Sequence, residues 1–229
     1  MDIQHNLQII KNRILDAEKQ YQKPCGSVKL LAVSKTRSVD EIKSAIIAGQ
    51  YMFGENYLQE ALPKIEALKE YENIEWHFIG PIQANKTKSI AKHFAWVHSL
   101  SRLRIAKRLN DQRPSNLPPL NICIEINVSA EITKSGVTFQ QLPDLAKAIS
   151  QLPCLTLRGL MAIPEETNDF TKQRANFHKV KQAFDALKTK HPNIDTLSMG
   201  MSNDFEAAIA EGATIIRLGT AIFGPRGHT

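Results

Sequence analysis

Apolar and polar residues alternate along the chain in blocks that favour helices and strands in turn. The first block has apolar residues at alternating steps of four and three, which is the spacing of one helix face. These residues are Ile3, Leu7, Ile10, Ile14, Ala17 and Tyr21. The spacing predicts an N-terminal helix over about residues 2–22, and Pro24 and Gly26 end it.

Short apolar runs and helix-like runs then alternate to the end of the sequence. The predicted strands cover residues 30–33, 51–56, 75–80, 95–100, 121–127, 157–163, 196–201 and 214–220. The predicted helices cover residues 39–49, 58–68, 84–92, 101–110, 139–150, 170–188 and 204–210. Eight strands separated by helices predict an α/β fold, a single closed (β/α)8 TIM barrel with an extra N-terminal helix.

The same pattern bears on domain organisation. The stretch from Pro114 to Pro119 is read as a loop, because strand and helix alternation resumes at once, so residues 1–229 form one predicted domain. An open doubly wound sheet is the alternative. Its first strand should be followed by Gly-x-Gly-x-x-Gly, and Lys35-Thr36-Arg37-Ser38 stands there instead.

Composition narrows the classes of function. The 229 residues are 42% hydrophobic with a net charge of +6, which suits an anionic ligand or nucleic acid. Basic residues are interleaved with acids and form no tract, so we expect no nucleic-acid partner. Cys25, Cys123 and Cys154 lie far apart, which predicts a reducing compartment and no metal site. With no secretory signal and no apolar run that could span a membrane, we expect a cytoplasmic protein without a membrane partner.

One lysine has a position suited to chemistry. Leu30 to Val33 form an apolar strand, and Lys35 follows at its carboxyl end, where barrels of this class build their sites. An amine can condense with a carbonyl to give a Schiff base, provided that it loses a proton. Desolvation and the neighbouring Arg37 would both lower its pKa. The ordinary alternative is that Lys35 is one more solvated charge.

Two further features suit an anion and an aromatic ring. Barrels often hold a phosphate between the loops after strands seven and eight, where Ser202 or Asn203 is a predicted N-cap and Gly219-Thr220 offers a close backbone and a hydroxyl. Plain helix capping is the alternative. Arg217 interrupts an apolar strand, and it either faces solvent or donates to a ligand inside the barrel. A Schiff-base lysine, a phosphate site and an arginine for a ring nitrogen together match pyridoxal 5′-phosphate (PLP).

Long motifs in this chain resemble one known family. They are Ala32-Val33-Ser34-Lys35-Thr36, Phe53-Gly54-Glu55-Asn56-Tyr57, residues 76–86, Arg158 to Pro164, Leu197 to Ser202 and Arg217 to Gly224. In this order, over nearly the whole chain, they resemble the pyridoxal phosphate homeostasis protein family, a single-domain relative of the alanine racemase barrel.

The resemblance implies roles for individual residues. Lys35 matches the lysine that holds the cofactor as an internal aldimine, and Arg217 matches the arginine that faces the pyridine nitrogen. Ser202, Gly219 and Thr220 match phosphate-loop positions. Asn56 matches a position near the cofactor, and His77 either lines the pocket or is a satisfied core residue.

The charge of Arg217 favours a carrier over an enzyme. A ring nitrogen that faces Arg217 stays unprotonated, which weakens the ring as an electron sink. We therefore expect a protein that binds PLP reversibly for vitamin B6 homeostasis, with an indirect effect on amino-acid balance and with PLP-dependent apo-enzymes as recipients. We expect a monomer with no catalytic residue. The alternative is a weak amino-acid racemase, which needs a second base. Related racemases take that base from an additional β domain, which we expect this chain to lack.

Overall fold

The structure is a computed structural model that describes residues 2–129 and 134–225. Its eight parallel strands close into a barrel in chain order, since β1 pairs with β2 on one side and with β8 on the other. The strands are β1 (Lys29–Val33), β2 (Met52–Glu55), β3 (Glu75–Phe78), β4 (Trp96–Leu100), β5 (Leu120–Ile126), β6 (Leu155–Ala162), β7 (Thr196–Ser198) and β8 (Ile215–Leu218). The prediction of an α/β barrel is confirmed, and the open sheet was the wrong alternative.

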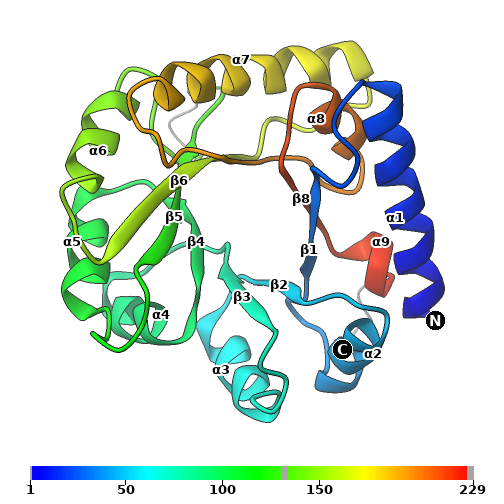
Figure 1. Cartoon of the computed structure of the whole chain (residues 1–229), viewed down its shortest axis with the longest axis horizontal. Helices are drawn as coiled ribbons and strands as arrows, with labels where there is room; N and C mark the ends of the chain where they lie inside the picture. The colour runs from blue at the N-terminus through cyan, green and yellow to red at the C-terminus, as the bar shows by residue number, and fades with distance from the viewer. Residues whose placement is uncertain (1, 130–133, 226–229) are drawn as a thin grey trace.

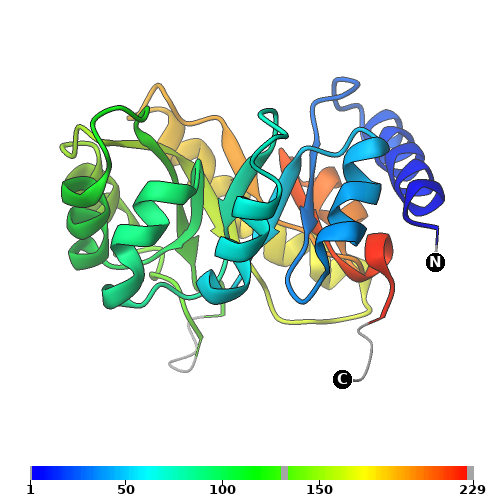
Figure 2. The ribbon, with the colours of Figure 1, turned by 90° about the horizontal axis from the view of Figure 1, so that it is seen from below.

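Helices form an outer ring around the strands (Figure 1). They are α1 (Ile3–Gln20), α2 (Val39–Ile47), α3 (Leu58–Ala67), η1 (Ala84–Lys86), α4 (Thr87–His93), α5 (Leu103–Gln112), α6 (Leu142–Ile149), α7 (Phe170–Lys188), α8 (Phe205–Ala210) and α9 (Thr220–Phe223). The additional helix α1 lies outside the ring and packs against α2, α8 and α9, as the side view also shows (Figure 2). This helix therefore covers the seam at which β8 meets β1.

Local sequence explains where the helices around that seam begin. Asp2 caps α1 by accepting a hydrogen bond from the backbone N–H of His5. Ser38 and Glu41 form a reciprocal capping box at the start of α2, which fixes the end of the loop that carries Lys35. The apolar stripe predicted for α1 is buried along the side that faces the barrel.

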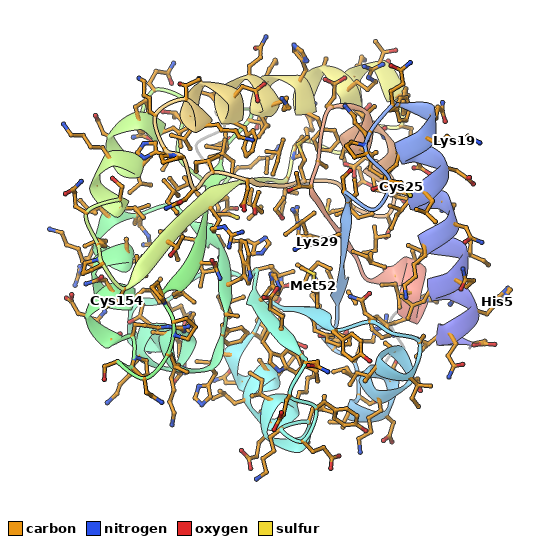
Figure 3. All side chains as sticks on the ribbon, in the orientation of Figure 1. His5, Lys19, Cys25, Lys29, Met52 and Cys154 are labelled. Carbon is orange, nitrogen blue, oxygen red and sulfur yellow. The ribbon has the colours of Figure 1, made fainter. Side chains whose placement is uncertain are left out.

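The barrel interior is filled with side chains from alternate positions of the strands, as in a packed core. Trp96, Cys123 and Met161 form an apolar cluster inside it. Lys29 and Met52, the first residues of β1 and β2, lie toward the centre of the ring in the view along the barrel (Figure 3). His77 and His98 are fully buried, so polar groups share this interior with the apolar ones.

The structure corrects the predicted boundaries that follow the last two strands. The eighth strand ends at Leu218, and Thr220 begins the short helix α9, which the sequence pattern did not predict. The seventh strand ends at Ser198, because Gly200 has a φ of +97° that continues no strand. Asp204, rather than Ser202 or Asn203, occupies the N-cap of α8.

Within residues 2–129 and 134–225, no helix has the length and the apolar composition to cross a bilayer.

Candidate functional site

The six predicted site residues come from four neighbouring strands at one end of the barrel. Lys35 follows β1 and Asn56 follows β2, whereas Ser202 follows β7 and Gly219-Thr220 follow β8. Arg217 lies within β8, where its register partner is Leu31 of β1. The order β7-β8-β1-β2 is continuous around the barrel, so these residues share one part of its carboxyl-terminal rim.

The turn that carries Lys35 is held in place by α3. Thr36 adopts a left-handed φ of 62°, and its backbone N–H donates to Oε2 of Glu60 at 2.8 Å. Nζ of Lys64 donates to the carbonyl oxygen of Ser34 at 2.8 Å. Both partners stand on α3, so one helix fixes the backbone on each side of Lys35, which is itself half-buried.

A second contact ties the same turn to the last helix. Nη2 of Arg37 donates to the carbonyl oxygen of Gly224 at 2.5 Å, and its Nη1 donates to that of Phe223 at 3.3 Å. Carbonyls at a helix C-terminus attract a cation, so the guanidinium suits this position. The Arg37 guanidinium, whose effect on the pKa of Lys35 stays a prediction, therefore joins the loop after β1 to α9.

A buried ion pair lies directly behind the turn. Glu55, the last residue of β2, is fully buried, and its Oε1 accepts from Nζ of Lys64 at 2.8 Å and from Oγ of Ser34 at 2.6 Å. Burial raises the pKa of Glu55, while the attraction of Lys64 opposes that rise. The pair is expensive to bury, yet it fixes the ends of β1 and β2 relative to α3.

Arg217 is buried inside the barrel rather than solvated. Its Nη1 donates to Oγ of Ser198 at 2.8 Å, and its Nη2 donates to the carbonyl oxygen of Ala162 at 3.0 Å. Burial lowers the pKa of Arg217 to about 10, and the carboxylates of Asp204 and Glu125 oppose that shift. The guanidinium therefore stays charged at neutral pH.

His77 is a satisfied core residue. Its Nε2 lies 2.9 Å from Oε1 of Glu75, and its Nδ1 lies 2.9 Å from Nε2 of His98. Both ring nitrogens therefore have partners within the protein, in agreement with one of the two interpretations that the sequence left open.

The loops after β7 and β8 approach β1 closely. A Cβ atom on Gly219 would lie 3.2 Å from the carbonyl oxygen of Val33, so a glycine allows this backbone to sit against the end of β1. Gly219 is the N-cap of α9, and Thr220 is the first residue of that helix. Ser202 is half-buried in the loop before α8. Backbone N–H groups and two hydroxyls therefore face the same rim from neighbouring loops.

Asn56 lies at the tightest backbone approach of this rim. A Cβ atom on Gly80 would lie 2.0 Å from the carbonyl oxygen of Asn56, so only glycine fits there. The Oδ1 atom of Asn56 is buried without a hydrogen-bond partner in the described structure. An unpaired buried acceptor is costly, and a ligand with a donor group would satisfy it.

A polar cavity of about 380 Å³ adjoins the rim at the ends of β3, β4 and β5. Ser99, Arg102 and Glu125 are among the residues that line it. Burial raises the pKa of Glu125 to about 7. In the described ranges, no group of three or more His, Cys, Asp or Glu residues is arranged to hold a metal ion.

Sequence reasoning missed the residues that support the site. The pair of Glu55 and Lys64 could have been predicted in part, because a glutamate that ends an apolar strand needs a cationic partner. Ser198 and His98 carried almost none, since they are 100 residues apart and meet only in the closed barrel.

The fold and the rim define the class of protein, which is a parallel α/β barrel with a lysine just after β1 and a buried arginine in the adjoining strand β8. Residues 2–227 match the family model described as "Alanine racemase, N-terminal domain". The chain is 50% identical over 230 residues to a pyridoxal phosphate homeostasis protein of Escherichia coli strain K12, covering 100% of this chain and 98% of that relative.

Solved structures agree with these matches. A protein from Bifidobacterium adolescentis, described as unknown, has a TM-score of 0.91 at 33% identity, covering 96% of this chain and 94% of that one. PipY of Synechococcus elongatus with PLP bound has a TM-score of 0.78 at 32% identity, covering 92% and 100%. This chain belongs to the alanine racemase N-terminal domain family and, within it, to the pyridoxal phosphate homeostasis proteins.

Proposed function

We propose that this protein binds PLP reversibly as a Schiff base on Lys35 and takes part in intracellular vitamin B6 homeostasis. The single observation that carries the proposal is the register of β1 and β8, which places the buried, charged Arg217 in the strand next to the one that Lys35 follows. The name of the E. coli relative and the PLP bound to PipY support the choice of cofactor.

The residues of the rim fit such a ligand. Lys35 would supply the amine, and condensation with an aldehyde forms a C=N bond and releases one water molecule. Ser202, Gly219 and Thr220 would take the phosphate, and Asn56 would offer its unpaired buried Oδ1 to a donor. Arg217 would face the ring nitrogen. Bound in this way, PLP supplies an electron-withdrawing ring.

Arg217 supports a carrier over a catalyst. Its guanidinium is charged at neutral pH, so it would keep a ring nitrogen beside it unprotonated and so limit withdrawal of electrons. We propose no catalytic role for the chain and expect PLP-dependent apo-enzymes to receive the cofactor, with amino-acid balance affected indirectly. We further propose a cytoplasmic monomer, in line with the three unpaired thiols of the described chain.

Borohydride reduction followed by peptide mapping tests the proposal. Reduction fixes the cofactor on the amine that holds it, so we expect one pyridoxyl adduct on Lys35. Lys35→Ala should abolish the visible absorption of the loaded protein. Lys19→Ala is the control, because Lys19 is an exposed amine on the outer side of α1 (Figure 3). An adduct spread over surface lysines, or a coloured Lys35→Ala protein, would contradict the proposal.

A weak amino-acid racemase is the second candidate, and Glu125 is the observation that favours it. A carboxyl with a pKa of about 7 beside the rim could accept or donate a proton near neutral pH. Incubation with L-alanine in deuterium oxide decides between the two. The enzyme would be favoured if the protein exchanged the α-proton well above the rate with PLP alone. That exchange should also be lost in Glu125→Gln.

A further inference from the structure

A line of polar side chains crosses the barrel interior beneath Arg217; Arg217, Ser198, His98 and His77 are buried, and the line ends at the partly exposed Glu75. Nη1 of Arg217 is 2.8 Å from Oγ of Ser198, which is 2.8 Å from Nδ1 of His98. Nε2 of His98 is 2.9 Å from Nδ1 of His77, and Nε2 of His77 is 2.9 Å from Oε1 of Glu75. We call these five residues the relay. It passes through β8, β7, β4 and β3.

The chemistry of its two ends assigns every proton in the relay. Arg217 can only donate, and the Glu75 carboxylate can only accept. The hydrogen bond from His77 holds the pKa of Glu75 below its ordinary value, so this end stays ionised. His77 must therefore carry its proton on Nε2, and its bare Nδ1 accepts from Nε2–H of His98. The bare Nδ1 of His98 accepts from the Ser198 hydroxyl, which in turn accepts from Arg217.

Burial keeps both rings in the neutral form that this assignment needs. Desolvation lowers the pKa of His77 despite the attraction of Glu75. Desolvation, His77 and Arg217 together lower the pKa of His98 well below its ordinary value. Each imidazole thus has one proton and one bare nitrogen, so all four hydrogen bonds run in the same direction, from Arg217 to Glu75.

The direction of the relay matters for the buried cation. Aligned hydrogen bonds polarise one another, so the negative charge of Glu75 is felt at the far end of the line. Asp204 and Glu125 also attract Arg217, and Lys29 lies near the Glu75 end. Ser198 and the carbonyl of Ala162 fix the plane of the guanidinium, since each accepts a hydrogen bond from one of its nitrogens.

We propose that Ser198, His98 and His77 are positioning residues that orient Arg217 toward the cofactor ring through a one-way hydrogen-bond relay anchored on Glu75. This inference rests on the proposed function and deepens it, because it assigns the ring-nitrogen contact to a built network. None of the three would touch the cofactor. The relay also accounts for two buried histidines and a buried serine that the rim does not use.

Nitrogen NMR of the cofactor-free protein tests the relay directly. We expect both His77 and His98 as neutral Nε2–H tautomers, and in Ser198→Ala the Nδ1 resonance of His98 should move because it loses its donor. A proton on Nδ1 of His98 would overturn the relay. This measurement needs no PLP, so its failure is distinct from a failure of the proposed function.

Cofactor binding tests the positioning role. Loss of a hydrogen bond to a buried charge should weaken PLP binding by about tenfold in Ser198→Ala and shift the pH midpoint of the visible band. Ser198→Thr keeps the hydroxyl and should restore that midpoint. Thr196→Val is the matched control, because its buried hydroxyl lies on the same strand and donates to Asp195 outside the relay.

Each result of the binding experiment decides the question. A weakened Ser198→Ala beside an unchanged Thr196→Val supports the positioning role. Equal behaviour of the two variants would overturn it, because any loss would then reflect β7 in general. A native protein that takes up no PLP would overturn both this role and the proposed function.

Discussion

Nζ of Lys64 lies 2.8 Å from the carbonyl oxygen of Ser34, the residue that directly precedes Lys35. The same ammonium is 2.8 Å from Oε1 of Glu55, so one buried cation joins the ends of two strands. The backbone that presents Lys35 is thus oriented by helix α3. The proposed Schiff base on Lys35 would need such support, because a small displacement of a reacting group is costly.

We expect Lys64→Met to destabilise the fold strongly. It leaves the Glu55 carboxylate buried and unpaired, which costs roughly 3–5 kcal/mol of the free energy of unfolding. Urea unfolding at neutral pH measures this loss. The added change Glu55→Gln should restore part of it, because no charge then remains buried.

Lys69→Met is the control for that experiment. Lys69 pairs with Glu66 in an i,i+3 contact just beyond α3, and both side chains are mostly exposed. Exposed pairs contribute little, so we expect no measurable change in stability. A Lys64→Met protein as stable as Lys69→Met would show that the buried pair does not support the turn.

Arg37 offers a test of the junction between the loop after β1 and α9. Arg37→Lys keeps the charge but loses the planar fork that reaches the carbonyl oxygens of residues 223–225. We expect faster hydrogen exchange in residues 220–223 and about tenfold weaker PLP binding, since Thr220 would be less well placed.

Arg13→Lys is the matched control for Arg37. Arg13 pairs with Glu206 between α1 and α8, and its side chain is about half exposed. The Arg13→Lys change should leave hydrogen exchange in residues 220–223 and PLP affinity unaffected. If Arg37→Lys bound PLP as tightly as Arg13→Lys, the junction would have no part in the site.

The raised pKa of Glu125 predicts that the stability of the protein depends on pH. Burial raises the pKa of Glu125 to about 7 from an ordinary value of 4.5. Between these values the folded protein binds more protons than the unfolded chain, so stability should fall as the pH rises from about 4.5 to about 7. At pH 8, Glu125→Gln should exceed the parent by about 1–2 kcal/mol, a figure reduced for partial solvent screening.

Urea unfolding at several pH values measures that effect. Below about pH 4 the Glu125→Gln variant and its parent should be equally stable, because the carboxyl is protonated in both states. Glu72→Gln removes an exposed carboxyl and should leave the pH profile of the parent unchanged. A Glu125→Gln profile parallel to that of the parent would contradict the prediction.

A change at Arg113 should affect the stability of the fold without affecting PLP binding. Arg113 donates to the carbonyl oxygens of Pro118, Ala91 and Phe94, and so ties the ends of α4 and α5 together. Arg113→Lys loses at least two of these bonds, which should cost about 2–4 kcal/mol of stability. PLP affinity should not change. The exposed Arg104→Lys serves as the control, and weaker PLP binding in Arg113→Lys alone would contradict this prediction.

Periodicity predicted the barrel because each strand and helix buries an apolar face of its own. The long helix α7 occupies residues 170–188 as predicted, and the N-terminal helix differs by one or two residues at each end. The pattern failed where backbone geometry decides. β8 ends at Leu218 and α9 begins at Thr220 after its N-cap Gly219, although Thr214 to Thr220 reads as one apolar run.

The site could be predicted in part. Lys35 and Arg217 stand out because each is a charge at the end of, or inside, an apolar strand. The relay could not be predicted, because Ser198 meets His98 only after the sheet has closed. The assignment of Asp204 as N-cap also depends on the turn after Gly200, which local sequence leaves open.

The pairing of β1 with β8 has a consequence for synthesis. Lys35 follows the first strand of the barrel and Thr220 follows the eighth, yet they border the same seam. A ribosome-bound chain that lacks its final strand has no seam and therefore no complete pocket. Cofactor capture would then report that the eighth strand has been made and that the barrel has closed.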